Sequence, residues 1–243
     1  MSSSLFPLLT YGPLNLDLQP HFDSTVGTLV VSNVRVSIHP DQFNVLASDN
    51  PVVVDKTIAE LDFQAWVLSR FSQPTSAYES PMNIHMNCSK GDPKDVAKRF
   101  MAGRDRLRRQ ASACLVLENE DKGMWTVENL YKYIYKECKV PITFDYLHHK
   151  CNPGSLSEEE AFHLCASTWD FHGLKPHFHY SQSLPGDKNP RKHADVPTLR
   201  PSTYNTDIDL DMEFKGKDDA IDRIEAMDKE FADANLRLQV LEV

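Results

Sequence analysis

The sequence contains no apolar run that approaches the roughly 20 residues of a membrane-spanning helix. Its N-terminus also lacks the basic segment followed by an apolar stretch that is typical of a secretion signal. The five cysteines are scattered, odd in number and never spaced as Cys-x-x-Cys, which argues against a cysteine zinc site and favours a reducing compartment. We therefore expect a cytoplasmic, intracellular protein without a membrane partner.

Positive charge is in short supply, with 26 Lys and Arg against 35 Asp and Glu and a formal net charge of -9. Contacts to phosphate need Lys and Arg, so this balance weakens a nucleic-acid partner. Clustered acidic metal ligands would inflate the figure, however, and bound divalent ions would offset part of it. Internal repeats and obvious linkers are also absent, so we expect residues 1–243 to form a single domain.

Short apolar or alternating segments alternate with amphipathic stretches along the chain. Helical spacing and capping signals predict helices over 51–72, 93–111, 125–138, 157–170 and 218–238. The other periodic segments predict strands over 34–39, 82–85, 113–118, 141–144, 175–181 and 207–213. Residues 182–206 form a polar loop too long to be a mere connector. This order predicts an α/β fold with parallel strands, open or closed into a TIM-type (β/α) barrel.

The predicted strands end on residues that can bind metal, namely His39, His85, Glu118, Asp145, His179 and Glu213. A single such residue is commonly structural, and Glu213 belongs to an acidic run that could simply be solvated. In a parallel barrel, however, all six would converge on one rim. Three carboxylates packed there would repel each other without a cation. The pattern therefore predicts a multi-metal site, and its nitrogen and oxygen ligands suit Zn²⁺, Mn²⁺ or Fe²⁺ better than Ca²⁺.

Four further histidines extend this set or flank it. His177 is two residues before His179, so both side chains point to one face of a strand. His148 follows Asp145 by three residues and could bind a second ion, whereas His149 is expected to point elsewhere. His193 lies in the long loop, where a ligand and an exposed loop histidine remain equally open. The remaining histidines are taken as structural: His21, His163 and His172.

Divalent ions bridged by carboxylates suit the hydrolysis of a phosphodiester, because one ion can generate hydroxide while another stabilises the leaving oxygen. Metal-dependent sugar isomerisation on a similar barrel also uses paired ions, but typically with more carboxylates and fewer histidines. The histidine-rich mixture favours cleavage of a phosphoester.

Six motifs carry a resemblance to a known family: Ile38-His-Pro-Asp-Gln-Phe-Asn-Val-Leu46, Leu117-Glu-Asn-Glu-Asp121, Phe144-Asp-Tyr-Leu-His-His149, His179-Tyr-Ser181, His193-Ala-Asp195 and Met212-Glu-Phe-Lys215. In order and spacing, from about Ser3 onward, they resemble the UV damage endonuclease family. The resemblance implies a metal-dependent TIM-barrel nuclease, grouped with endonuclease IV, that nicks damaged double-stranded DNA 5′ to UV photoproducts and related lesions. It also implies two or three divalent ions, most often Mn²⁺, with Zn²⁺, Mg²⁺ or Co²⁺ as options.

The resemblance further implies a role for each residue. One ion would be held by His39, His85 and Glu118. A second ion, which Glu118 would bridge to the first, would be held by Asp145, His179 and Glu213, and a third by His148 and His193. His177 joins the metal set not through the resemblance but through its place on the same strand face as His179. The catalytic carboxylates would be Glu118, Asp145 and Glu213. Gln42 and Phe43 match a pair that enters the duplex opposite the lesion, although Phe43 could instead pack its loop. Phosphate would meet Lys188, Arg191 and Lys192.

The sequence departs from the family pattern at three places. His177 stands where the family has a lysine that is carboxylated and bridges metals, and Tyr11 stands where a histidine usually follows Leu-Phe-Pro. The segment Met1–Pro7 resembles the tail of the second barrel strand, so the first strand, the first helix and most of the second strand are expected to be missing. A fragment, an internal start or a partner chain or segment that supplies the missing strands would each explain this. Alternative functions are an abasic-site endonuclease, a metal-dependent sugar isomerase, or a truncated relative without turnover.

Overall fold

The strands of the protein run parallel to one another in a computed structural model that describes residues 35–71 and 77–241. A three-stranded sheet has the order β1 (Met82–Ile84), β2 (Leu115–Glu118) and β3 (Ile142–Thr143). A second sheet pairs β4 (His177–Tyr180) with β5 (Asp209–Met212). The predicted alternation of parallel strands with helices is therefore confirmed for this part of the chain.

Two isolated parallel bridges join these sheets into a longer series. Ile38 bridges to Met82 at the outer edge of β1, and Asp145, directly after β3, bridges to His179 in β4. The neighbours therefore follow the chain order, from the segment around Ile38 through β1 to β5. Because all run in one direction, their C-terminal ends lie at the same edge.

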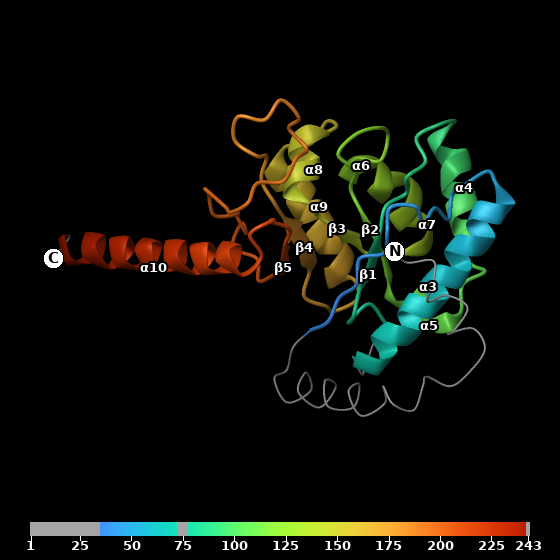
Figure 1. Cartoon of the computed structure of the whole chain (residues 1–243), viewed down its shortest axis with the longest axis horizontal. Helices are drawn as coiled ribbons and strands as arrows, with labels where there is room; N and C mark the ends of the chain where they lie inside the picture. Colours follow the sequence, from blue (N-terminus) through green and yellow to red (C-terminus); the bar gives the residue numbers. More distant parts are fainter. Residues whose placement is uncertain (1–34, 72–76, 242–243) are drawn as a thin grey trace.

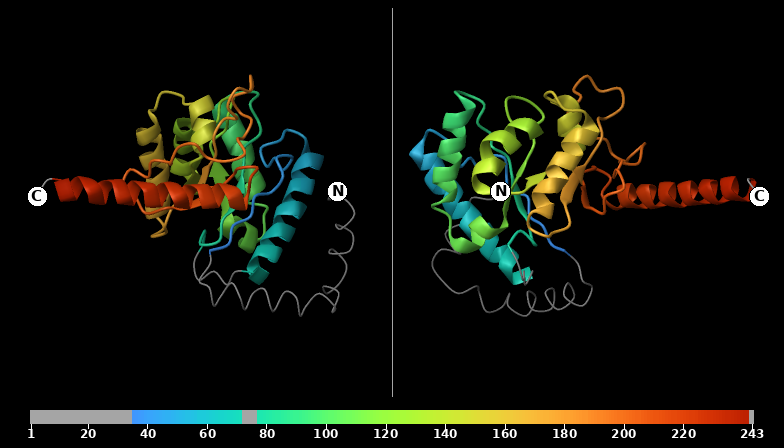
Figure 2. Two further views of the ribbon diagram at one scale, coloured as in Figure 1. Left: turned by 60° about the vertical axis from the view of Figure 1, so that its left-hand side comes forward. Right: turned by 180° about the vertical axis from the view of Figure 1, so that it is seen from behind.

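Helices surround the strands. In Figure 1, helices before β3 in the chain lie beside β1 and β2, helices α8 and α9 lie beside β3 and β4, and α10 projects away from the rest; Figure 2 shows the same arrangement from two other sides. The helical elements are α3 (Pro51–Phe71), α4 (Pro93–Arg104), α5 (Arg109–Cys114), α6 (Val127–Leu130), the π-helix η1 (Tyr131–Tyr135), α7 (Lys136–Cys138), α8 (Tyr146–Cys151), α9 (Glu158–Asp170) and α10 (Asp218–Leu241). Within the described ranges, a helix long and apolar enough to cross a bilayer does not occur.

Two predicted helix starts are confirmed by their caps. The Asp92 side chain accepts a hydrogen bond from the backbone N–H of Lys94, with Pro93 at the first helical position. At α9 both halves of the capping box are present, since Ser157 and Glu160 each bond to the backbone of the other. These caps satisfy N–H groups that have no partner inside the helix.

The helix predicted to run from 93 to 111 is wrong in its second half. It ends at Arg104, and the chain turns through residues 105–108 before α5 begins. The turn is held against α3, because the N–H of Arg108 bonds to Asp62 Oδ1 at 2.8 Å and Arg106 pairs with Asp55 at 2.6 Å. As a result Ala113 and Cys114, expected to begin a strand, are helical. Similarly, the helix predicted from 125 starts at 127, because Thr126 accepts the N–H of Asn129 as its cap.

The strand predicted over 34–39 is also wrong as a regular strand. Val34 lies outside the described residues, and of 35–39 only Ile38 makes a bridge. Side chains occupy its other edge, where Arg35 Nη1 lies 3.0 Å from Asp209 Oδ2 and Ser37 Oγ lies 2.9 Å from Asp211 Oδ2. The last described strand is thus tied to the first described segment by side chains.

Apolar side chains fill the space between the strands and α9. Phe144 packs edge to face against Phe162 and Phe178, each with ring centroids 5.9 Å apart, and Trp169 is fully buried beside them. This core fixes the positions of β3 and β4. All five cysteines are free thiols. The expectations for Met1–Pro7, Tyr11 and His21 lie outside the described residues.

Candidate metal centre

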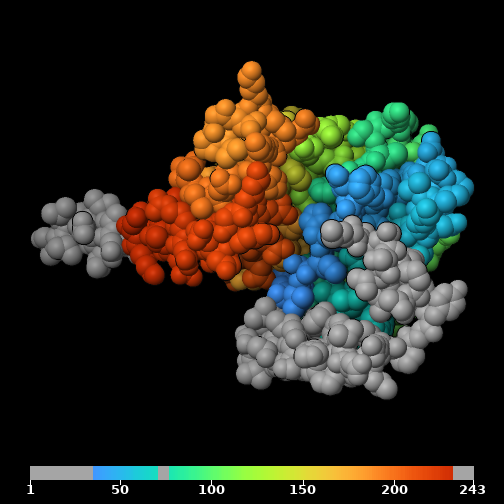
Figure 3. Space-filling view, viewed as in Figure 1, coloured from blue at the N-terminus to red at the C-terminus, as the bar shows by residue number. Residues whose placement is uncertain are grey.

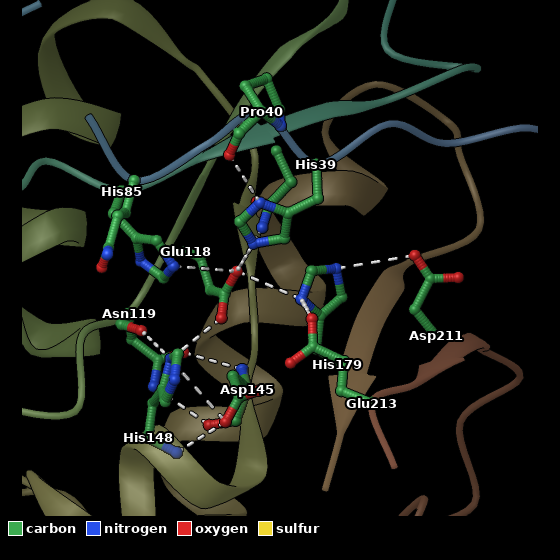
Figure 4. A network of polar contacts seen from close by, with 12 residues as sticks. His39, Pro40, His85, Glu118, Asn119, Asp145, His148, His179, Asp211 and Glu213 are labelled. Atoms are coloured by element: carbon green, nitrogen blue, oxygen red, sulfur yellow. Dashed lines mark hydrogen bonds and ion pairs between the residues drawn. The ribbon is translucent and has the colours of Figure 1, made fainter. Parts of the chain in front are cut away.

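The carboxylate of Glu118, at the C-terminal end of β2, is fully buried and faces imidazole rings (Figure 4). Its Oε2 lies 3.1 Å from His179 Nδ1, 3.2 Å from His39 Nε2 and 3.7 Å from His85 Nε2. Its Oε1 lies 2.9 Å from His148 Nδ1. We call Glu118 and these four histidines the Glu118 cluster; its rings come from four different segments of the chain.

Backbone carbonyls hold two of these rings. His39 Nδ1 lies 3.1 Å from the carbonyl oxygen of Pro40, so Nε2 faces Glu118. His148 Nδ1 lies 2.9 Å from the carbonyl oxygen of Asn119. Histidines that bind metals are commonly held in this way through the ring nitrogen that does not bind the ion. For His39 the arrangement leaves Nε2 as the nitrogen that faces the cluster.

Asp145 has two tasks, one for each carboxylate oxygen. Its Oδ1 accepts a hydrogen bond of 2.6 Å from the backbone N–H of His148 and so caps α8. In the described part of the chain, its buried Oδ2 has no hydrogen-bond partner. The sequence did not predict α8, which spans only residues 146–151. This single turn and a half brings His148 next to Glu118, while His149 packs against Phe144.

Strands β4 and β5 contribute His179, Glu213 and a residue that sequence reasoning missed. His179 Nδ1 lies 3.2 Å from Glu213 Oε1 as well as 3.1 Å from Glu118. Two residues earlier on each strand, His177 Nε2 lies 3.3 Å from Asp211 Oδ2. Asp211 belongs to the same acidic run as Glu213 and was not predicted as a ligand. Its spacing from Glu213, two residues on one strand, is the signal that places both on one face.

The pKa values show that the surroundings of the Glu118 cluster favour positively charged groups. Burial opposes ionisation of Glu118, but the nearby His85, His179 and His148 outweigh it and hold its pKa well below the usual range. Burial also opposes protonation of His148, yet Asp145 and Glu118 raise its pKa to about 10. For the same reasons Glu118 and Glu213 raise the pKa of His179, and Glu118 raises that of His39. Protons thus supply cationic charge to this site.

The remaining groups respond to burial in different ways. Burial lowers the pKa of His85 and raises that of Asp145 to about 6. At Asp211 the effect of burial is outweighed by His177, which lowers the pKa to about 2. At Glu213 it is outweighed by the neighbouring His179, 3.2 Å away, so that pKa is lowered too. Two neighbouring carboxyls, Asp145 and Glu213, are therefore shifted in opposite directions.

The donor atoms fit divalent metal ions. Buried polar atoms normally have hydrogen-bond partners, yet within the described residues His85 Nδ1, Asp145 Oδ2 and both ring nitrogens of His179 have none. Four sets of three ligand atoms each lie within 4.8 Å of one another: His39, Glu118 and His179; His85, Glu118 and His148; Asp145, His179 and Glu213; His177, His179 and Asp211. Imidazole and carboxylate together suit Mn²⁺, Zn²⁺ and related ions.

The structure therefore gathers eight of the nine histidines and acids that the sequence singled out as ligands. His193 does not share any of these sets in the described part of the chain. Its Nδ1 lies 2.8 Å from the carbonyl oxygen of Glu213, which brings it to the edge of the site. Of the histidines predicted to be structural, His172 Nε2 lies 2.8 Å from the carbonyl oxygen of Lys139, and His163 Nε2 lies 4.0 Å from Glu159 Oε1.

The residues singled out for DNA lie on two exposed loops. The side chain of Phe43 is 77% exposed, and the carbonyl of the neighbouring Gln42 accepts a hydrogen bond from Asn87. The long loop stands out from the surface beside α10 (Figure 3). Within it Lys188 is exposed, whereas two basic side chains pair with acids of the same chain, Arg191 with Asp121 at 3.4 Å and Lys192 with Asp187 at 2.7 Å.

Comparisons with known proteins agree with this geometry. The sequence model for UV-endonuclease UvdE matches residues 1–239. The UV DNA damage endonuclease of Bacillus cereus (strain Q1) is 31% identical over 230 residues, which cover 90% of this chain and 71% of the relative. That of Bacillus mycoides (strain KBAB4) is 30% identical with the same coverage.

Solved structures support an α/β fold of the TIM-barrel type. SacUVDE superposes with a TM-score of 0.76 at 25% identity, covering 93% of this chain and 77% of that structure. A D-psicose 3-epimerase from Clostridium cellulolyticum H10 has a TM-score of 0.50 at 16% identity, covering 76% and 64%, and shows a likeness of fold alone. The predicted absence of the first strands stays a prediction. With its family motifs on the strand ends and a match along nearly its whole length, the chain belongs to the UV-endonuclease UvdE family.

Proposed function

We propose that this protein is a metal-dependent DNA repair endonuclease that nicks damaged duplex DNA 5′ to UV photoproducts and related lesions. Membership of the UV-endonuclease UvdE family supports the reaction. The observation that carries the metal dependence is the buried Glu118 carboxylate, which faces ring nitrogens of three histidines at 2.9 to 3.2 Å. Such a carboxylate is stable only beside positive charge.

Two or three divalent ions, Mn²⁺ before Zn²⁺, Mg²⁺ or Co²⁺, would supply an activated water and stabilise the leaving oxygen of the phosphodiester. Glu118 belongs to two of the ligand sets, so it links two such positions. Asp145 and Glu213 share His179 in a third set. Glu118, Asp145 and Glu213 are in this proposal the catalytic carboxylates, and His193 joins His148 as a ligand only if its ring leaves the Glu213 carbonyl.

The exposed loops suit a bound duplex. An aromatic wedge can support an unstacked base step, while an amide satisfies the exposed base edges; Phe43 and Gln42 have these side chains at an exposed site. Lys188 is the basic residue of the long loop best placed for phosphate, because Arg191 and Lys192 are paired with acids. These two would have to exchange their carboxylate partners for phosphate.

Replacing Glu118 tests the proposal directly. We expect Glu118→Gln to lower Mn²⁺-supported nicking of a photoproduct-containing duplex at least 1,000-fold, on the order of a lost catalytic electrostatic group. Glu137→Gln, at an exposed position of α7, removes the same charge and is expected to nick like the parent protein. Cleavage that survives in Glu118→Gln, or that proceeds equally in excess chelator, would refute the metal assignment.

The same preparation separates the alternatives. A matched duplex with an abasic site in place of the photoproduct tests for an abasic-site endonuclease, and a panel of ketoses tests for an isomerase. We expect the photoproduct duplex to be cut preferentially and the sugars to remain unchanged. The likeness to the epimerase does not favour the second alternative, because it concerns the fold alone.

A further inference from the structure

A second polar group shares His179 with the Glu118 cluster and lies on neighbouring faces of β4 and β5. It consists of His177, His179 and Asp211, and we call it the Asp211 group. In the parallel pairing His179 stands opposite Asp211, and His177 lies two residues earlier on the same face as His179. The His179 ring lies between the two groups, with Nδ1 toward Glu118 and Nε2 toward Asp211 (Figure 4).

The Asp211 group has the dimensions of a cation site. Asp211 Oδ2 lies 3.3 Å from His177 Nε2 and 3.8 Å from His179 Nε2. Atoms that share an ion at about 2.1 Å lie roughly 3 to 3.5 Å apart, so little adjustment is needed. The same oxygen accepts a 2.9 Å hydrogen bond from Ser37 Oγ, which fixes the carboxylate from the opposite side. Ligands to metals are commonly held by such an additional hydrogen bond.

Hydrogen bonding inside the chain does not account for these rings. His177 is 4% exposed and His179 only 1%. Among the described residues, His177 Nδ1 and both nitrogens of His179 have no hydrogen-bond partner. A buried polar atom left unpaired destabilises the fold, because it has lost its hydrogen bonds to water without replacing them. Two buried imidazoles turned toward one oriented carboxylate are therefore better explained by a shared cation than by packing.

We propose that His177, His179 and Asp211 bind a divalent cation of their own, in addition to those on the Glu118 cluster. The proposal rests on the proposed function, which requires such ions to be present. Two nitrogens and one oxygen favour Zn²⁺, Co²⁺ or Mn²⁺ over Ca²⁺. An ion at His179 Nε2 replaces any proton on that atom, and the proton leaves to solvent. Asp211 is thereby a ligand, and Ser37 is a residue that positions it.

Counting bound ions tests this site without any DNA. The protein is stripped of metal, dialysed against Mn²⁺ alone, and its bound manganese is measured by mass spectrometry. We expect Asp211→Asn to hold one ion fewer per chain than the parent protein. Asp207→Asn removes the same charge from an exposed residue that pairs with Lys175, and is expected to keep the parent's count.

A second variant protects the test from misfolding. His177→Gln is expected to lose the same single ion, and circular dichroism of the metal-free variants reports whether each is folded. If either folded variant keeps the full count of ions, the Asp211 site is refuted, whatever the nicking assay shows. If Asp211→Asn loses one ion but the parent protein does not nick DNA, the site stands and the proposed function fails.

Discussion

In the Glu118 cluster, protons on the histidines supply the positive charge that the buried carboxylates require. In the ion-free protein His148 has a pKa of about 10 and the pKa of His179 is well above its usual range, so both rings are protonated at neutral pH. A group whose pKa is raised on folding stabilises the fold below its unfolded pKa and ceases to do so as the pH rises through its folded pKa. These two histidines therefore stabilise the ion-free fold at pH 6.5, and the contribution of His148 is lost as the pH rises toward about 10.

Metal binding should show the opposite trend. Because an ion displaces protons from His148 and His179, we expect the Mn²⁺ affinity to rise between pH 6 and 8, with release of about one proton or more per ion. Calorimetric titration in two buffers of different ionisation enthalpy gives that proton count. Binding at pH 7 without proton release would mean that these imidazoles are not ligands.

At this scale the sequence indicated most of the residues that gather at the site, but it did not indicate Asp211. Glu118, Asp145, His179 and Glu213 were recognised because each lies at or near the end of a predicted strand. Asp211 was not recognised, because a strand in which acidic and apolar residues alternate indicates a solvent-exposed acidic face until the neighbouring strand is known. The structure supplies that neighbour, since His177 Nε2 on β4 lies 3.3 Å from Asp211 Oδ2.

Among the elements, α8 has the most direct effect on the site. Asp145 both caps this helix and aims its second oxygen into the metal centre. A helix of six residues has little stability of its own, so its cap and its packing decide whether it forms. Six residues are also too few for a hydrophobic period, which is why the sequence did not predict it. The break at 105–108 was missed for a related reason, since contacts to α3 rather than local signals create it.

Two substitutions of Asp145 separate its tasks. Asn caps helices as well as Asp does, so Asp145→Asn is expected to keep the cap of α8 while losing metal affinity. Asp145→Ala is expected to lose the same affinity and, in addition, about 1 kcal/mol of unfolding free energy relative to Asp145→Asn. Urea unfolding and Mn²⁺ titration measure the two quantities. Equal stability of both variants would show that the cap contributes nothing.

At the scale of the molecule, Arg35 connects parts of the chain that are far apart in sequence. Its guanidinium bonds to the carbonyl oxygens of Glu79 at 2.6 Å and Lys175 at 2.8 Å, and to Asp209 Oδ2 at 3.0 Å. It also lies over the ring of Trp169. The parallel order of the strands could be predicted from the alternation of elements. The contacts of Arg35 could not, because the sequence pattern of one segment does not show which distant segment it packs against.

Arg35→Lys tests whether these contacts stabilise the fold. Lysine keeps the charge but cannot reproduce a planar fork of donors, so we expect a loss of about 2 kcal/mol of unfolding free energy. Arg106→Lys is the matched control: Arg106 pairs with Asp55 at the surface, and we expect a change of less than about 0.5 kcal/mol. If both variants unfold at the same urea concentration as the parent, the side chain of Arg35 does not hold the two edges together.

The ligands of the metal centre span the sequence from His39 to Glu213, on segments that meet only in the folded chain. The unfolded chain has no comparable site, so ions bind the native state almost alone. By mass action, free metal at about 100 times its dissociation constant adds roughly 2.7 kcal/mol to the free energy of unfolding. On the proposed metal dependence, the concentration of available divalent ions would therefore set part of the stability of the fold itself, and metal starvation would lower the amount of folded protein before any substrate is present.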